Sequence, residues 1–134
     1  MSDAVSTTIR PVPDLDSQQY WNGCKNRELL VRRCGSCNTY RIPPGPGCPE
    51  CGSMKSDWIK IQGKGEIFTY TVVHRAKVPY NIIVVSLPEA DGVHMLSALV
   101  DCKNEDIHIG MPVEVVFEEI GGGMMLPKFR PART

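Results

Sequence analysis

The chain has 134 residues, a hydrophobic fraction of 42%, and equal numbers of basic and acidic side chains, 15 of each. This length is enough for one compact unit with a real core, or for two small modules that share an interface. A net charge of zero gives the chain no general attraction to a polyanion, which argues against a protein whose main partner is nucleic acid.

The sequence gives no sign of a membrane or secretory protein. No stretch is long and apolar enough to span a bilayer, and residues 1–12 contain neither an apolar run nor a basic start. We therefore expect no signal peptide and a cytoplasmic location. Cysteines in that compartment are kept reduced, so they are expected to serve as thiols or metal ligands rather than as a disulfide scaffold.

The N-terminal unit is expected to span residues 1–27. Residues 1–13 are polar and aperiodic, which is typical of a loose arm. Asp14 or Asp16 can then cap a short helix that contains residues 17–21. The expected apolar side of this helix consists of Leu15, Tyr20, Trp21 and Cys24. We expect its aromatic rings to pack against the next module rather than to contact a ligand.

Four cysteines form two pairs of equal spacing, Cys34 with Cys37 and Cys48 with Cys51, separated by ten residues. Two such pairs place four thiolates at the tips of two facing turns, and this arrangement suits tetrahedral Zn²⁺ in a structural site. Iron in a rubredoxin-like centre and two disulfides remain alternatives.

Residues 28–62 are expected to form the ribbon that carries these turns. Asn38 and Gly52 each follow the second cysteine of a pair, and both residue types tolerate the positive φ that a tight turn requires. The proline-rich loop 43–47 connects the two turns. The expected strands are 28–33, 39–42 and 56–61.

Basic side chains are frequent near the cysteines in the sequence. Four thiolates with one Zn²⁺ leave two negative charges, which nearby cations can offset. The four candidates for this role are Arg32, Arg33, Arg41 and Lys55.

From residue 63 to residue 134, strand-like segments alternate with proline and glycine breaks. Five strands of this length suit a small closed barrel of the OB type better than a sandwich. The prediction is thus a mainly β protein with a short N-terminal helix, a zinc ribbon and a C-terminal five-stranded barrel. The expected barrel strands are 66–75, 81–87, 93–100, 111–120 and 124–130.

Three blocks of the sequence follow the order of a known family. Cys34–Ser53 ends in CPECGS, Gly63–Arg75 reads GKGEIFTYTVVHR, and Ile109–Pro131 contains IGMPVEVVFE and LPKFRP. On these blocks, residues 14–132 resemble the acyl-CoA-associated family that joins a rubredoxin-like zinc ribbon to an OB-fold. The resemblance implies that the zinc is structural and that the barrel helps to bind acyl-CoA or to bridge catalytic partners.

The same resemblance implies an accessory subunit in a hetero-oligomer with a thiolase-fold enzyme. In some members of the family the partner is instead a steroid aldolase or an acyl-CoA hydratase. The thiolase partner would supply the nucleophilic cysteine that cleaves a 3-oxoacyl-CoA with free coenzyme A. Some relatives belong to thiolases for aromatic acyl-CoA compounds, such as benzoylsuccinyl-CoA in anaerobic toluene breakdown, and the substrate of this chain stays open.

The chain is not expected to be catalytic alone, because no nucleophile, base and acid can be assembled from its residues. Cys24 and Cys102 are expected to be packed, inert thiols. His74 ends the longest strand and is expected to be packed or to contact the ligand. A stand-alone enzyme, electron transfer at an iron-loaded site, and a nucleic-acid-binding zinc ribbon with an OB-fold are the rival functions.

Coenzyme A requires cations for its phosphates and an apolar wall for its pantetheine arm. If the strands follow the OB order, basic residues of the loop after the first barrel strand could meet those of the last segment on one rim. Solvated surface charge is the alternative. The candidate ligand-binding residues are His74, Arg75, Lys77, Lys128 and Arg130, with Arg133 nearby in the sequence.

Overall fold

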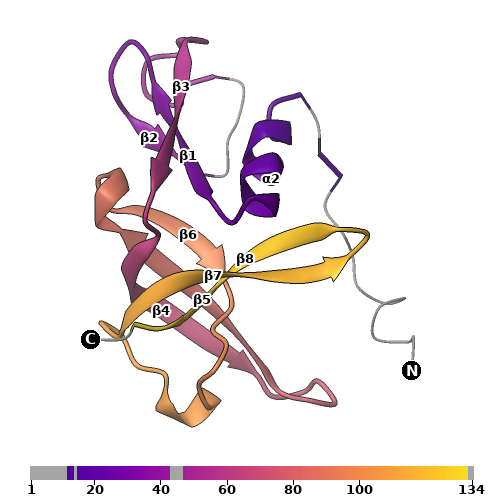
Figure 1. Ribbon diagram of the computed structural model, residues 1–134. Coiled ribbons are helices and arrows are strands. Elements are labelled where there is room, and N and C mark those ends of the chain that lie inside the picture. The colour runs from indigo at the N-terminus through magenta and orange to yellow at the C-terminus, as the bar shows by residue number, and fades with distance from the viewer. Residues whose placement is uncertain (1–11, 14, 43–46, 133–134) are drawn as a thin grey trace.

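Consecutive parts of the chain form a short helix, a three-stranded ribbon and a five-stranded barrel (Figure 1). The structure is a computed structural model that describes residues 12–13, 15–42 and 47–132. The expectations for the arm before residue 12, Asp14, the loop 43–46 and Arg133 lie outside the described residues. Within the described part of the chain, no helix has the length and apolar character needed to cross a bilayer.

Helix α2, Gln18–Lys25, begins after Ser17 and ends at Asn26, so it is longer than predicted. Asp16 is not its cap, and the Asp16 carbonyl instead accepts a hydrogen bond from Arg32 NH1 at 3.2 Å. Gly23 does not end the helix. A Cβ at Gly23 would lie 2.8 Å from Leu30 Cδ1, so glycine allows the helix to approach the ribbon closely.

The apolar side of α2 consists of fewer residues than predicted. Tyr20 and Cys24 are buried and Trp21 packs against the core, whereas Leu15 is 96% exposed. Leu15 precedes the first helical turn, so the helical period that places the other three side chains on one face does not apply to it.

The ribbon is an antiparallel sheet of β1 (Leu29–Cys34), β2 (Tyr40–Arg41) and β3 (Ser56–Ile61), with β1 in the middle. Leu29 and Val31 of β1 are fully buried and join one core with the barrel residues. The ribbon and the barrel are therefore packed together rather than merely linked.

The barrel strands are β4 (Lys64–Val73), β5 (Tyr80–Leu87), β6 (Val93–Ser97), β7 (Pro112–Gly121) and β8 (Met124–Pro131). They form a curled antiparallel sheet in the order β6-β5-β4-β7-β8, with the short helices η1 (Pro88–Ala90) and η2 (Asn104–Asp106) in the connections. The prediction of a mainly β protein with a short helix, a zinc ribbon and a five-stranded OB barrel is confirmed.

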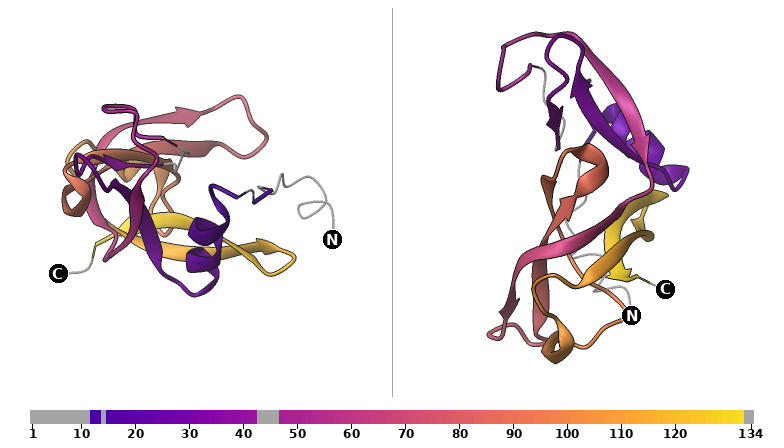
Figure 2. Two further views of the ribbon diagram at one scale, coloured as in Figure 1. Left: turned by 90° about the horizontal axis from the view of Figure 1, so that it is seen from above. Right: turned by 90° about the vertical axis from the view of Figure 1, so that its left-hand side faces the viewer.

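The two edges of the curled sheet meet through the segment after β6. Phe129 N donates to the Ala98 carbonyl at 3.0 Å, and Val100 N donates to the Phe129 carbonyl at 2.8 Å. The predicted strand 93–100 thus ends at Ser97, because the chain leaves β5 there and Leu99 pairs in parallel with Phe129 of β8. Figure 2 shows the curled sheet from two further directions.

The barrel core follows from the alternation of β5. Ile83, Val85 and Leu87 point inward and are fully buried, and Phe129 of β8 contributes the largest fully buried side chain. Asn81 is buried in the same row. Its amide binds the Leu99 backbone from both sides, with Leu99 N donating to Asn81 Oδ1 at 2.7 Å and Asn81 Nδ2 donating to the Leu99 carbonyl at 3.0 Å.

A carboxylate and a glycine form the junction between ribbon and barrel. Glu89 of η1 accepts hydrogen bonds from Gln62 N at 2.9 Å and Gly63 N at 3.2 Å. Gly63 has φ +79°, and a Cβ there would lie 2.3 Å from Val115 Cγ1. The chain can therefore pass from β3 into β4 beside β7 only with glycine at this position.

We expect Gly63→Ala to destabilise the protein more than Gly110→Ala. Both glycines have positive φ, but nothing lies within 4 Å of a Cβ at Gly110, so that variant carries only the backbone cost of about 1–2 kcal/mol. The clash with Val115 should add about 1–3 kcal/mol for Gly63→Ala. Denaturant unfolding of the two variants measures the difference, and equal losses would contradict this account of the junction.

Candidate functional site

The four cysteine sulfur atoms of Cys34, Cys37, Cys48 and Cys51 all lie within 4.8 Å of one another. Cys34 Sγ is 3.6 Å from Cys51 Sγ, and Cys37 Sγ is 3.6 Å from Cys48 Sγ. A tetrahedral zinc site with Zn–S bonds of about 2.3 Å has sulfur separations of about 3.8 Å. The four cysteines are therefore positioned for zinc binding.

The two turns that carry the sulfurs repeat one hydrogen-bond pattern. Cys34 N donates to the Thr39 carbonyl at 2.8 Å and Asn38 N donates to the Cys34 carbonyl at 3.0 Å. In the second turn, Cys48 N donates to the Ser53 carbonyl and Gly52 N donates to the Cys48 carbonyl, both at 2.9 Å.

The predicted positive φ is present in both turns, at +63° for Asn38 and +75° for Gly52. Ser36 Oγ and Ser53 Oγ lie 2.8 Å apart and so connect the two turns directly. The local sequence thus folds each turn in the same way, and the ribbon places the two turns face to face.

Backbone N–H groups favour the charged form of the buried sulfurs. The N–H groups of Cys37 and Ser36 point at Cys34 Sγ, at 3.4 and 3.3 Å, and lower the pKa of Cys34 to about 6. The N–H groups of Cys51 and Glu50 likewise lower the pKa of Cys48. Preformed thiolates are the form that binds a metal ion.

The sulfurs also destabilise one another as anions. The Ser53 N–H lowers the pKa of Cys51. The adjacent Cys34 and Cys37 side chains have the opposite and larger effect, so the pKa is raised to about 12 overall. A divalent cation among the sulfurs would remove this repulsion. The described cysteines form no disulfide, and the separation of 3.6 Å within each facing pair exceeds the roughly 2 Å of a disulfide bond.

One of the cations expected to offset the charge of the site has a different set of contacts. Arg32 donates from Nε to Ser56 Oγ at 2.6 Å and lies 4.8 Å from the ring centre of Trp58. With its bond to the Asp16 carbonyl, Arg32 connects the ribbon to the start of α2. Its role in balancing the thiolate charge stays a prediction.

The candidate ligand-binding residues fall into two separate groups. His74, Arg75 and Lys77 are exposed on the turn between β4 and β5. Arg130 pairs with Glu114, which lies opposite Lys64 at the start of β4. Because β4 has ten residues, roughly 30 Å of strand separates the two groups (Figure 1). The expected convergence on one rim is not found.

The two basic residues of β8 are engaged with β7. Lys128 Nζ lies 2.7 Å from Glu118 Oε1, and Arg130 NH2 lies 2.8 Å from Glu114 Oε2. Arg130 and Glu114 face each other across the β7–β8 hairpin, whereas Lys128 and Glu118 are diagonal neighbours. The two side chains thus have a structural use that the sequence analysis did not assign.

The outer face of β4, β5 and β6 exposes large apolar side chains that the sequence analysis did not single out. Phe68, Tyr80 and Leu96 are exposed by 53%, 50% and 70%, and the His94 ring stacks on Phe68 with 4.1 Å between the ring centres. We call these four residues the outer sheet face. The sequence of β5 contains no charged residue, but it does not show which of its apolar side chains face solvent.

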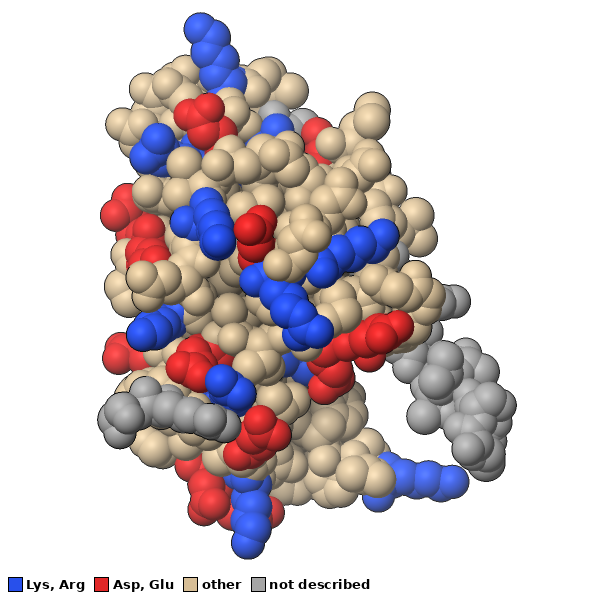
Figure 3. Space-filling model, viewed as in Figure 1, with Lys and Arg blue, Asp and Glu red and all other residues tan. Residues whose placement is uncertain are grey.

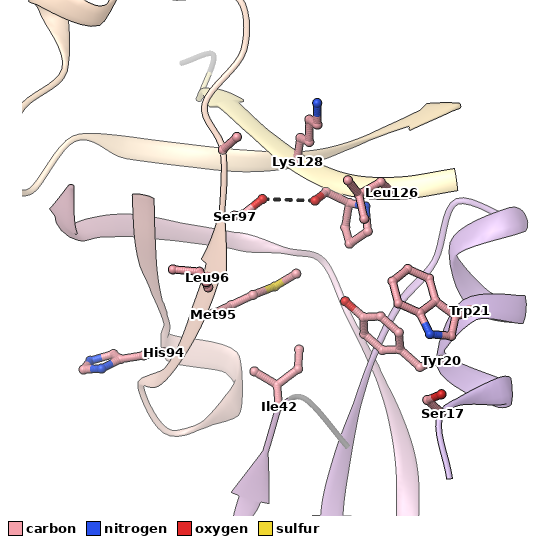
Figure 4. A pocket seen from close by; sticks show the side chains of 12 residues that line it. Ser17, Tyr20, Trp21, Ile42, His94, Met95, Leu96, Ser97, Leu126 and Lys128 are labelled. Carbon is pink, nitrogen blue, oxygen red and sulfur yellow. Dashed lines mark hydrogen bonds between the residues drawn. The ribbon is translucent and has the colours of Figure 1, made fainter. Parts of the chain in front are cut away.

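A cavity of about 480 Å³ lies where α2 covers the gap between β6 and β8 (Figure 4). We call it the helix–barrel pocket, and its apolar lining includes Tyr20, Trp21, Ile42, Met95, Leu126 and Pro127. The aromatic residues of α2, expected only to pack, therefore also line a cavity. No sequence signal could have located it, because its walls come from the helix, the ribbon and two barrel strands.

Two family descriptions match consecutive parts of the chain. Residues 21–54 match the ChsH2 rubredoxin-like zinc ribbon domain, and residues 58–118 match the ChsH2 C-terminal OB-fold domain. The first match covers the end of α2 and the metal-binding turns, and the second covers most of β3 and the barrel as far as β7.

Individual proteins are similar over most of the chain. A DUF35 domain-containing scaffold protein of Methanocaldococcus jannaschii is 40% identical over 108 residues, which cover 75% of each chain. A probable enoyl-CoA hydratase alpha subunit of Thermomonospora curvata is 37% identical over 92% of this chain, and the aligned part is 40% of that subunit's length. A solved structure called Ltp2-ChsH2(DUF35) aldolase contains a chain that is 36% identical with a TM-score of 0.82, covering 91% of this chain and 98% of that chain.

We expect Cys48→Ser to remove bound zinc and unfold the ribbon. Zinc binding to such a site is coupled to folding, and its binding free energy of about 10 kcal/mol or more contributes to the stability of the fold. Cys102→Ser makes the same chemical change at a half-buried thiol outside the four sulfurs and should retain one zinc per chain. Elemental analysis and circular dichroism of both variants test this expectation. A folded Cys48→Ser protein without metal, or a red wild-type protein that contains iron, would contradict it.

Proposed function

The chain belongs to the ChsH2 (DUF35) family, which joins a rubredoxin-like zinc ribbon to an OB-fold, and on this premise we propose that it is a non-catalytic scaffold subunit of an acyl-CoA-processing enzyme. Its catalytic partner is a thiolase-fold chain that cleaves a 3-oxoacyl-CoA with free coenzyme A. Structural Zn²⁺ on the four cysteines holds the ribbon over residues 28–62, and the barrel over residues 63–134 contacts the partner and its substrate.

The observation that carries this proposal is the solved structure named as an aldolase. Its similar chain is matched over 98% of its length, so that chain consists of the same ribbon and barrel and little else. The hydratase subunit contains the same unit within a longer polypeptide. A unit that occurs with enzymes of different chemistry is expected to assemble or support the complex rather than perform one reaction.

The thiols outside the metal site support a non-catalytic role. Burial raises the pKa of Cys24 to about 12, so this thiol is protonated at neutral pH and is a poor nucleophile. Burial and the nearby Asp106 carboxylate also raise the pKa of Cys102. The His94 ring stacks on Phe68, and among the described residues the four cysteines form the one group of three or more His, Cys, Asp or Glu side chains that could hold a metal ion.

The net charge of zero and the distribution of charge on one visible face favour a protein partner over nucleic acid. On the face seen in Figure 3, basic and acidic side chains are interspersed, and no continuous basic area is formed. A protein that binds a nucleic-acid backbone requires such an area to displace counterions from phosphates.

The outer sheet face is the surface that we assign to the catalytic partner. Neighbouring inward residues of β5 fill the barrel core, yet the outward row of this sheet presents aromatic and aliphatic side chains to solvent. Exposed apolar side chains that gather on one face of a sheet mark a surface for another protein. Burying the exposed part of Phe68 alone would stabilise a complex by about 1–2 kcal/mol.

We expect Phe68→Asp to abolish capture of the partner, because the introduced carboxylate would be desolvated in the interface. Ile109→Asp is the matched control, since Ile109 is 67% exposed on the loop between η2 and β7 and outside the outer sheet face. Affinity purification from the native source, with mass identification of the captured chain, compares both variants with the wild type.

Capture of a thiolase-sized chain by the wild type and by Ile109→Asp supports the proposal. An aldolase or a hydratase in its place would change the assigned reaction and leave the scaffold role intact. Thiolysis catalysed by the isolated chain would overturn the non-catalytic assignment. An aromatic substrate such as benzoylsuccinyl-CoA is the first to assay in the purified complex.

The exposed turn after β4 is the part of the barrel that we assign to coenzyme A. Arg75 and Lys77 form no ion pair with the described residues, so both cations and the adjacent His74 can meet phosphate oxygens. Lys128 and Arg130, which are paired with glutamates, would first have to give up those partners.

We expect Arg75→Ala to raise the KM of the complex for acyl-CoA about threefold to tenfold, because one charge-assisted hydrogen bond to phosphate is lost. Lys103→Ala removes an exposed cation beside η2 and should leave the KM unchanged. Steady-state kinetics of the reconstituted complex provide the measurement. Equal KM values for Arg75→Ala and the wild type would remove this turn from the substrate site.

A further inference from the structure

The helix–barrel pocket has the size and lining of a small-molecule site. Its volume of about 480 Å³ falls within the range of about 300–1,000 Å³ that is typical of ligand pockets. Apolar side chains of α2, β6 and β8 form most of its wall, with Ile42 of the ribbon at one side (Figure 4). The pocket lies where β6 and β8 are adjacent but not hydrogen-bonded as neighbouring strands.

The pocket wall includes one largely buried residue, Tyr20, whose hydroxyl has no hydrogen-bond partner among the described residues. Tyr20 is 93% buried, since only 7% of it is exposed, and its hydroxyl points away from α2 into the cavity (Figure 4). Among the described residues, none forms a hydrogen bond with this hydroxyl, and the Tyr20 ring packs edge-on against the Trp21 ring with 5.0 Å between the ring centres. The hydroxyl oxygen is not fully shielded from solvent, so a ligand oxygen would take the place of water as its hydrogen-bond partner.

The chemistry of the pocket favours an uncharged ligand. Lys128 is the one cationic residue of the lining, and its ammonium group pairs with Glu118 at 2.7 Å and points away from the cavity in Figure 4. His94 also points away, and the Ser97 hydroxyl donates to the Pro127 carbonyl at 3.0 Å. Burial raises the pKa of Tyr20, so its hydroxyl stays protonated at neutral pH and is a hydrogen-bond donor.

We propose that the helix–barrel pocket binds an uncharged aromatic or acyl group with one carbonyl oxygen, and that the Tyr20 hydroxyl donates a hydrogen bond to this oxygen. The Trp21 ring and the Met95 side chain provide the apolar contact for the rest of the group. The proposal does not rest on the scaffold role, although His94 and Leu96 belong both to the lining of this pocket and to the outer sheet face. It gives the chain a ligand of its own at the junction of helix, ribbon and barrel.

The test uses a matched pair of probes with the full chain, 2-acetylnaphthalene and 2-ethylnaphthalene, which have similar shapes but differ in the carbonyl oxygen. Nuclear magnetic resonance titration follows the Trp21 indole N–H and the Met95 methyl group. We expect both probes to shift these signals and the ketone to bind about threefold to tenfold more tightly, as one neutral hydrogen bond predicts.

Tyr20→Phe removes only the hydroxyl and should equalise the affinities of the two probes. Tyr80→Phe makes the same change on the exposed outer sheet face and should keep the preference for the ketone. Leu126→Trp should fill the pocket and weaken both probes. If that variant fails to fold, the tyrosine pair still decides the question.

Shifts confined to residues outside the pocket, or a ketone preference that persists in Tyr20→Phe, would overturn the proposal. Absence of binding of both probes to the wild type would also overturn it. Capture of the catalytic partner is measured in a separate experiment without these probes, so failure of the pocket and failure of the scaffold role can be distinguished.

Discussion

The clustering of four sulfur atoms within 4.8 Å is the constraint on which the rest of this structure depends. The ribbon that carries the sulfurs has short strands and few apolar residues, so its own core is too small to hold the two turns together. A metal ion bound by the four thiolates would supply this attraction. Through β1 and β3, the same site fixes the position of α2, which Arg32 and Gly23 hold close to the ribbon. Loss of the metal is therefore expected to affect the helix and the pocket beneath it as well as the ribbon.

The barrel serves as a rigid support whose surfaces differ in character. Its inner row is apolar and closed by the parallel contact of residues 98–100 with β8, while the outer sheet face is apolar and open to solvent. An exposed apolar surface does not stabilise a monomeric protein. The outer sheet face therefore fits a chain that binds a larger partner. The helix–barrel pocket shares His94 and Leu96 of β6 with the outer sheet face, so a ligand and a partner would lie next to each other at this strand.

Much of the fold followed from local patterns in the sequence. The two CxxC pairs, with Asn38 and Gly52 behind them, determine the shape of each metal-binding turn, since only four thiols and two positive φ values are required. The five barrel segments were recognisable because β-branched and apolar residues are interrupted by proline and glycine at Pro79, Pro88 and Gly110. The nearly continuous apolar run of residues 81–87 indicated a strand, but it did not show which of its side chains face the core.

Other features were decided only by tertiary structure, because they depend on segments that are distant in sequence. The segment predicted as one strand, 93–100, ends early because Leu99 pairs with β8 instead of continuing along β5. The basic residues of β8 form ion pairs with glutamates of β7 rather than pointing toward a ligand. The pocket arises where α2 covers a gap between two strands, which no local pattern encodes. The sequence by itself determined the metal-binding turns and the strands, since each depends on near neighbours, and the folded chain alone decided which side chains meet across them.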